Sequence, residues 1–223
     1  MQHDSDKIFF EFLIKNILLH YNIIDDKFVK SESPDFISEN IGLEITRADP
    51  TLKFDGFINK YPKEKIGNIE KFNKKFELSG GKVFRKTDAI VDILGLVDTF
   101  GYHEDYVYII PSYKNSLYFI NEKINNKIGK LNNTYKKEID IYYLAVFTTA
   151  YINEDMVKEE FVILDELQKD EQKQFDKIII IFLDKICIFD LANKKYEIID
   201  NVNQEINKLS QETKEELYDT NKN

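Results

Sequence analysis

The pattern of apolar and polar residues changes from a helical to a strand-like period within the first fifty residues. Across residues 6–21, apolar side chains recur every three or four positions, which is the spacing of an amphipathic helix. Segments 27–30, 36–38 and 41–47 then have the composition and alternation of strands. Residues 39–40 between the last two predict a hairpin turn. We therefore expect a helix followed by three strands.

The second half of the chain predicts another long helix and several strands. Residues 116–135 carry an apolar stripe at helical spacing, with lysines along its border. A strand is expected at 139–148 and a helix near 155–173, followed by two strands in the runs KIIIIFL and KICIFDL. The uninterrupted apolar run 178–183 is typical of an interior strand that is buried on both faces.

These elements predict one α/β domain over residues 1–200, with a central mixed sheet flanked by helices. Residues 49–86 are interpreted as an insertion after the third strand, because turn residues enclose a lysine-rich helical stretch there. Residues 201–223 are polar and acidic, and we expect them to form a C-terminal tail.

The composition of the chain indicates the cellular compartment in which the protein is expected. Of the 223 residues, 43% are hydrophobic, which is enough for one substantial core. The single cysteine, Cys187, lies in an apolar run and has no partner for an intrachain disulfide, as is usual in a reducing cytoplasm. The first residues mix charges with apolar side chains and lack a cleavage site, so neither secretion nor a membrane is expected. We expect a cytoplasmic protein.

A carboxylate inside the third predicted strand is the clearest indication of chemistry. In LEITR, residues 43–47, the side chains of Glu44 and Thr46 share one face of the strand. Charge is depleted from strand interiors, so Glu44 either faces solvent or is placed in a cleft. Asp35 follows Pro34, and an Asp after a Pro is, when taken alone, explained by a turn. On paired strands, however, Asp35 and Glu44 could bring two oxygen ligands to one Mg²⁺.

The order of elements, together with Pro34-Asp35 and Glu44, resembles the PD-(D/E)XK nuclease superfamily. The resemblance covers about residues 6–148 without the insertion. In that family the two acids lie on adjoining strands of a bent hairpin and hold a divalent metal. The resemblance thus implies a restriction-endonuclease-like core, Mg²⁺ or Mn²⁺ bound by Asp35 and Glu44, and DNA as the partner. By the same analogy Glu11 on the first helix is a third metal ligand, or else a solvated helix residue.

The family motif has a lysine two residues after the second acid, where this chain has Thr46, an E-x-T variant. Arg47 points to the opposite face of a regular strand, so it cannot simply replace that lysine. In the superfamily the lysine can migrate to the second helix, where Lys127 lies nearest the apolar seam. We expect Lys127 to act in catalysis, with Lys123 as second choice and Lys130 farther round the helix. The alternative is that these lysines only solvate a helix edge.

Two functions follow from these observations. The resemblance implies a metal-dependent nuclease that hydrolyses DNA phosphodiester bonds, in restriction, phage or mobile-element conflict. Enzymes that cut both strands often act as homodimers, and the aromatic segment 104–113 is a candidate interface. The net charge of −9 argues against binding nucleic acid by bulk electrostatics, although lysines cluster locally. The charge and Thr46 favour the alternative, an inactive nuclease-like or unrelated α/β protein that serves as a protein-interaction module.

Overall fold

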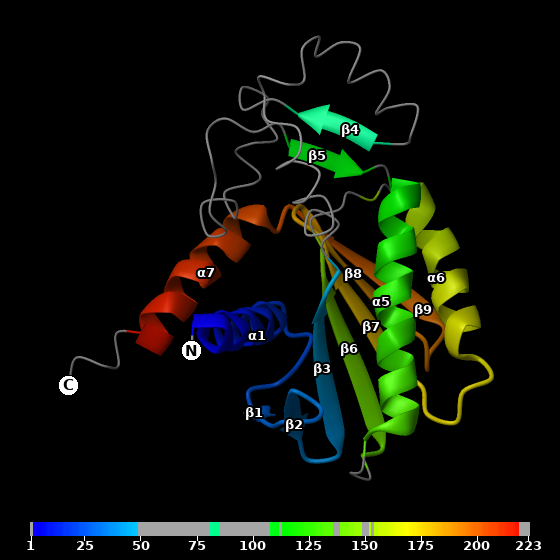
Figure 1. Ribbon diagram of the computed structural model, residues 1–223, viewed down its shortest axis with the longest axis horizontal. Coiled ribbons are helices and arrows are strands. Elements are labelled where there is room, and N and C mark those ends of the chain that lie inside the picture. Colours follow the sequence, from blue (N-terminus) through cyan, green and yellow to red (C-terminus); the bar gives the residue numbers. More distant parts are fainter. Residues whose placement is uncertain are drawn as a thin grey trace.

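The computed structural model describes residues 2–48, 81–84, 108–111, 113–135, 139–148, 152 and 154–218. Seven strands form one mixed sheet: β1 (Val29–Lys30), β2 (Phe36–Ser38), β3 (Ile41–Arg47), β6 (Ile141–Phe147), β7 (Lys177–Ile181), β8 (Lys185–Asp190) and β9 (Lys195–Asp200). They lie in the order β1-β2-β3-β6-β7-β8-β9 (Figure 1). The β3–β6 and β6–β7 pairs are parallel and the other neighbours antiparallel.

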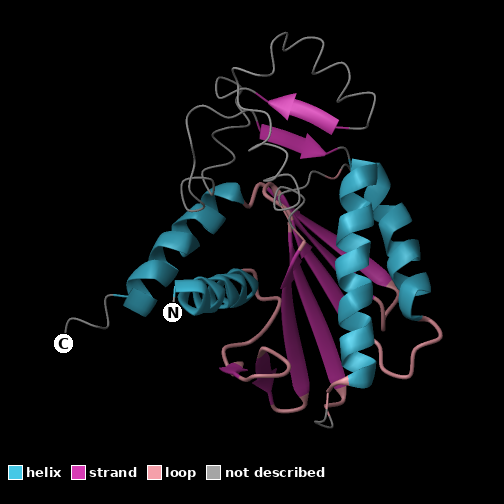
Figure 2. Ribbon diagram, viewed as in Figure 1, coloured by secondary structure: helices cyan, strands magenta, loops and turns pink. Residues whose placement is uncertain are grey.

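Helices cover both faces of this sheet (Figure 2). They are α1 (Gln2–His20), α5 (Tyr113–Asn133), α6 (Glu154–Gln168) and α7 (Asn203–Tyr218). Apolar residues of α1 and α7 form a core on one face, and those of α5 and α6 form a second core on the other. Two further strands, β4 (Gly81–Phe84) and β5 (Tyr108–Pro111), pair in a separate antiparallel sheet. The predicted α/β class, a mixed sheet flanked by helices, is confirmed.

The predicted interior strand lies at the centre of the C-terminal half. β7 pairs with β6 on one side and with β8 on the other, and residues 178–183 are all buried. Ile179 and Ile181 pack into the core beneath α1, whereas Ile178 and Ile180 pack into the core beneath α5. The run is apolar without alternation because both of its faces are covered.

Two boundaries differ from the sequence-based prediction. α6 ends at Gln168 rather than near residue 173, because the Gln168 side chain both accepts from the Phe175 N–H, at 2.9 Å, and donates to its carbonyl, at 2.8 Å. These bonds close the loop that leads into β7. β9 was not expected; it is a short edge strand in which charged residues flank Tyr196, Ile198 and Ile199, and none of its residues is fully buried.

The C-terminal region is not a simple polar tail. Asn203–Tyr218 forms α7, which packs against α1, and its buried positions are Ile206, Leu209, Ser210 and Thr213. Their spacing is that of one helix face. Two of the four are Ser and Thr, so the stripe is inconspicuous as a hydrophobic pattern. The sequence predicts a polar tail here because some of the buried side chains carry hydroxyl groups and do not look like core residues. Thr213, for example, accepts a hydrogen bond from Asn16 of α1 at 2.9 Å.

Replacing Ile206 by alanine should therefore destabilise the whole domain. Ile206 is fully buried against α1, and removing a buried Ile side chain typically costs about 2–5 kcal/mol. Urea unfolding followed by circular dichroism measures this loss. Gln204→Ala, an exposed position on the same helix, should change the free energy of unfolding by less than about 0.5 kcal/mol. Equal stability of the two variants would mean that α7 does not contribute to the fold.

Some predicted features lie outside the described residues. Of the insertion 49–86, only β4 is described, and of the candidate interface 104–113, only β5 and Tyr113. Among the helices that the structure describes, none has the length and apolarity needed to cross a membrane.

Candidate functional site

The hairpin of β2 and β3 places Asp35 opposite Glu44. Its register pairs Phe36 with Leu43, and one further step along the same register sets Asp35 against Glu44. Side chains of directly opposed residues point to the same face of a sheet. Glu44 is also the register partner of Leu144, which packs in the core beneath α5. The two carboxylates therefore lie on the face that α5 covers.

Two local features hold Asp35 in place. Its Oδ2 accepts a hydrogen bond from the backbone N–H of Ile45 at 2.7 Å, which ties the residue to β3. Pro34 packs directly over Gly42 of β3, where a Cβ atom would lie 2.7 Å from the Pro34 ring. Glycine inside this strand is thus required for the close approach of the preceding segment. As a result Asp35 is only 6% exposed and its carboxylate has a defined position.

Glu44 is the centre of the site and is 1% exposed. Its Oε1 accepts hydrogen bonds from the Lys127 ammonium at 2.5 Å and from the Lys130 ammonium at 2.9 Å. Its Oε2 accepts one from the Tyr135 hydroxyl. Both lysines belong to α5, and Tyr135 follows two residues after its end. We call Asp35, Glu44, Lys127, Lys130 and Tyr135 the Glu44 cluster.

The packing of α5 explains why its lysines reach a buried acid. Ile124, Ile128 and Leu131 are buried in the same core as residues of β6 and β7, which fixes the helix against the sheet. Lys127 and Lys130 leave the helix beside this stripe, and their aliphatic stems span the edge of the core. The side chains of Lys127 and Lys130 stay 21% and 37% exposed, so their ammonium groups lie between solvent and Glu44.

The pKa values of the two acids are shifted in opposite directions. Burial, and then repulsion by Glu44, raises the pKa of Asp35 to about 6, although the Ile45 N–H works against this. Burial also acts to raise the pKa of Glu44, but the charge of Lys127 and the hydrogen bonds from Lys127, Tyr135 and Lys130 outweigh it, and the pKa falls. Burial and the charge of Glu44 raise the pKa of Tyr135, so its hydroxyl remains a donor. Near neutral pH, both carboxylates are mainly ionised.

Glu11 lies near the cluster but is engaged elsewhere. Its carboxylate contacts Lys30 at 2.5 Å and Lys7 at 3.5 Å. Its charge still contributes to the raised pKa of Asp35. In the part of the chain that the structure describes, no three His, Cys, Asp or Glu side chains are grouped so as to hold a metal ion. The structure thus brings together Asp35 and Glu44 but does not join Glu11 to them as a third ligand.

The lysines on α5 differ in part from the expectation. Lys127 reaches Glu44, whereas Lys123 is exposed and makes no contact with it. Lys130 was placed farther round the helix, yet its ammonium meets the same oxygen as that of Lys127. Side chains three residues apart are neighbours on a helix surface, and their long stems can converge on one acceptor.

Tyr135 was not identified from the sequence. It lies four residues after Leu131, which is a core position, so an apolar role would have been assigned to it. Its ring is indeed buried, 6.0 Å from the ring of Tyr142 between centroids. That its hydroxyl reaches a carboxylate 91 positions earlier in the chain depends on the tertiary fold.

The oxygen donors of the cluster suit a hard divalent cation. Each carboxylate oxygen offers about two lone pairs. Among the residues that the structure describes, Oε2 of Glu44 accepts from Tyr135 alone, and no hydrogen bond reaches Oδ1 of Asp35. Magnesium needs few protein carboxylates because it keeps several of its waters. Asp35 and Glu44 are therefore the residues that could hold such an ion.

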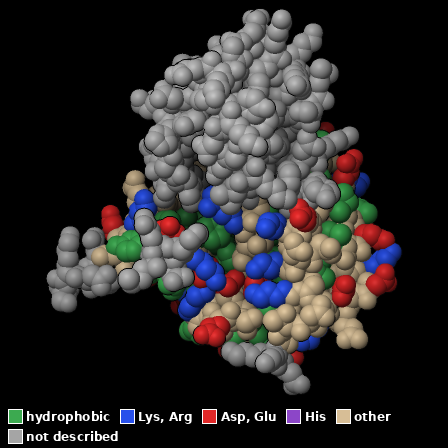
Figure 3. Space-filling model, in the orientation of Figure 1, with side chains coloured by type: hydrophobic (Ala, Val, Ile, Leu, Met, Phe, Trp, Pro, Cys, Tyr) green, Lys and Arg blue, Asp and Glu red, His purple; other side chains and the backbone are tan. Residues whose placement is uncertain are grey.

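Basic side chains gather on the molecular surface near the β2–β3 hairpin. Lys and Arg residues gather in the middle of the face seen in Figure 3, with acidic ones between them, where Figure 1 shows β3 between α1 and α5. Lys15 and Lys30 lie over the ring of Phe36, at 5.6 and 4.8 Å from its centroid. This face is therefore locally basic although the net charge is −9.

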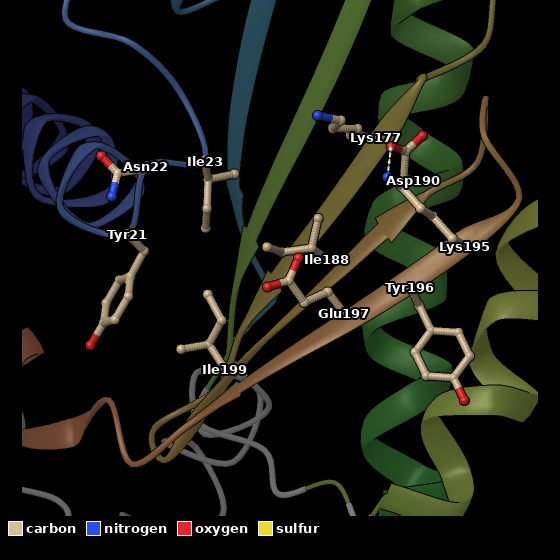
Figure 4. A pocket seen from close by; sticks show the side chains of 10 residues that line it. All are labelled: Tyr21, Asn22, Ile23, Lys177, Ile188, Asp190, Lys195, Tyr196, Glu197 and Ile199. Carbon is tan, nitrogen blue, oxygen red and sulfur yellow. Dashed lines mark ion pairs between the residues drawn. The ribbon is translucent and has the colours of Figure 1, made fainter.

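A separate cavity of about 440 Å³ lies on the other face of the sheet (Figure 4). Lys177, at its edge, is the register partner of Tyr143, whereas Glu44 is the partner of the next residue, Leu144. Successive strand residues point to opposite faces, so the cavity and the Glu44 cluster are separated by the sheet. The cavity is lined by side chains of both charges, among them Lys177, Lys195, Asp190 and Glu197.

Comparison with known proteins gave no relative. No family model matches the chain, and neither curated proteins nor solved structures produced a match.

Proposed function

We propose that the protein is a metal-dependent nuclease that hydrolyses DNA phosphodiester bonds and has a restriction-endonuclease-like core. The observation that carries the proposal is the contact of Lys127 with Glu44, beside Asp35 on the same face of the hairpin. These are the two acids and the lysine that the PD-(D/E)XK resemblance implies, with the lysine supplied by α5. The element order α1, β1-β2-β3, α5 and β6 supports the same proposal.

In this proposal each residue has a separate role. Asp35 and Glu44 would hold Mg²⁺ or Mn²⁺, Tyr135 orients the Glu44 carboxylate, and Lys130 keeps it ionised in the free protein. The bound metal supplies polarisation of the phosphate and a water of lowered pKa. Lys127 brings a positive charge to the rim of the buried acids, where it can stabilise the charge that develops on the phosphate oxygens. Glu11 contributes through its charge on Asp35 rather than as a ligand.

The partner that we propose is DNA, because the locally basic surface near the β2–β3 hairpin accommodates a phosphate backbone. The choice of DNA over RNA, a homodimer, and a role in restriction, phage or mobile-element conflict follow only from the family resemblance. We propose them together with the nuclease activity.

A protein-interaction module without catalysis is the second candidate. It is favoured by the hydrogen bonds that both oxygens of Glu44 already accept within the protein. Thr46 in place of the motif lysine points the same way. In such a protein the cluster would be a buried structural ion pair, and adding Mg²⁺ or Mn²⁺ would release no binding heat.

Asp35→Asn should abolish the proposed activity. The change keeps the shape of the side chain and removes the charge that holds the metal, so we expect cleavage of plasmid DNA to fall by roughly 100-fold or more. Calorimetric titration with Mn²⁺ should show a matching loss of binding. Asp26→Asn, an exposed position in the same segment, is the matched control and should cleave like the wild type. DNA cleavage that persists in Asp35→Asn, or wild-type protein that binds no Mn²⁺ either alone or with DNA, would reject the nuclease proposal.

A further inference from the structure

The Glu44 cluster is balanced in charge without a metal ion. It contains two carboxylates, Asp35 and Glu44, and two ammonium groups, Lys127 and Lys130, so its formal charge near neutral pH is zero. Glu11 lies outside the cluster and pairs with Lys30 and Lys7 instead. A divalent cation would add two positive charges to a region where Glu44 is 1% exposed and charges are poorly screened.

The two lysines are not held equally. Lys127 is the more buried, contacts Glu44 at 2.5 Å and also lies 3.4 Å from the carbonyl oxygen of Ile45. Lys130 is more exposed, contacts Glu44 at 2.9 Å and lies 5.3 Å from the centroid of the Tyr135 ring. Its stem reaches the site from the solvent side. Lys130 is therefore the ammonium that can leave Glu44 at the lower cost.

We propose that Lys130 couples metal binding to substrate binding: its ammonium neutralises Glu44 in the free protein and turns to a substrate phosphate when DNA and the metal bind together. This inference rests on the proposed nuclease function. The substrate phosphate supplies negative charge that balances the positive charge of the metal ion. The movement of Lys130 leaves an acceptor position free on Oε1 of Glu44. The free protein thus binds a divalent cation weakly, and DNA raises that affinity.

The coupling has a reciprocal consequence. If DNA raises the affinity for the metal by some factor, the metal must raise the affinity for DNA by the same factor. Lys130 sets the size of that factor, since it is the charge exchanged between the carboxylate and the phosphate. A lysine that only solvated the helix edge would have no such effect.

The test is a calorimetric titration of Mn²⁺ into the free protein, comparing the wild type, Lys130→Met and Lys123→Met. Methionine keeps the length of the stem and removes the charge. We expect Lys130→Met to bind Mn²⁺ roughly tenfold more tightly than the wild type, because one repelling charge near the metal is lost. Lys123→Met removes the same charge from an exposed position of α5 and should bind as the wild type does. Thermal unfolding confirms that each variant is folded.

The titration is then repeated with a short DNA duplex of phosphorothioate linkages, which slow hydrolysis. The wild type should gain metal affinity on addition of this duplex, and Lys130→Met should gain clearly less. Equal Mn²⁺ affinity of the free wild type and Lys130→Met would overturn the inference and leave the metal site in place. Absence of Mn²⁺ binding in every protein, with and without the duplex, would overturn the proposed function itself.

Discussion

Replacing Lys127 by alanine is expected to lower DNA cleavage by roughly 100-fold or more at saturating metal, the scale of one group that stabilises a transition state. Lys127 is the less exposed of the two ammonium groups on Glu44 and the one closest to it. In the variant, Lys130 still contacts Glu44, so the buried acid keeps a counter-charge. The fold and metal binding should therefore survive while the rate falls.

The rate is measured under single turnover, at a metal concentration that saturates each variant. Lys123→Ala should cleave at the wild-type rate, because its side chain is exposed and makes no contact with Glu44. Lys130→Ala should have a much smaller effect than Lys127→Ala under these conditions, since the proposed role of Lys130 is in metal affinity. Equal rates for the wild type and Lys127→Ala would remove Lys127 from the mechanism.

Replacing Glu160 by glutamine is expected to stabilise the protein above neutral pH. Glu160 lies on α6 and is 0% exposed, and within the described part of the chain neither of its carboxyl oxygens meets a hydrogen-bond donor at bonding geometry. Burial raises its pKa from the ordinary 4.5 to about 7, with a smaller opposing effect of Asn121. A buried charge without a partner is costly, so ionised Glu160 opposes folding.

The sign of the pH dependence follows from that shift. Below about pH 4.5, Glu160 is protonated in both folded and unfolded chains and costs nothing through ionisation. As the pH rises to about 7, the unfolded chain loses its proton first, and the domain loses up to about 3 kcal/mol of stability. Glu160→Gln stays neutral, so its advantage over the wild type should be near zero at pH 4 and roughly 2–3 kcal/mol at pH 8.

Urea unfolding at several pH values measures this difference. Glu159→Gln is the matched control, because Glu159 is the exposed neighbour on the same helix and its replacement should change stability little at any pH. A wild-type protein whose stability relative to Glu160→Gln does not depend on pH would mean that the pKa of Glu160 is the same in the folded and unfolded chains, as a counter-charge beside it would produce.

Much of the fold was predictable because its signals are local. The helical spacing of α1, the alternation of β3 and the uninterrupted apolar run of β7 each follow from which faces of one element are buried. The hairpin register places Asp35 opposite Glu44 through turn chemistry and strand pairing within a dozen residues. Strands that lie so close together in the sequence have few alternative ways to pair.

The sequence by itself therefore determined the α/β class, the order of the main elements, and the pair of acids on adjacent strands. Only the tertiary structure decided what surrounds those acids. It packs α5 over β3, so that Lys130 joins Lys127 on one oxygen of Glu44 and Tyr135 reaches the other. It also decided that Ser210 and Thr213 are buried against α1, which makes α7 part of the fold. Such contacts join residues far apart in the chain, and they depend on how helices lie against the sheet, which periodicity does not encode.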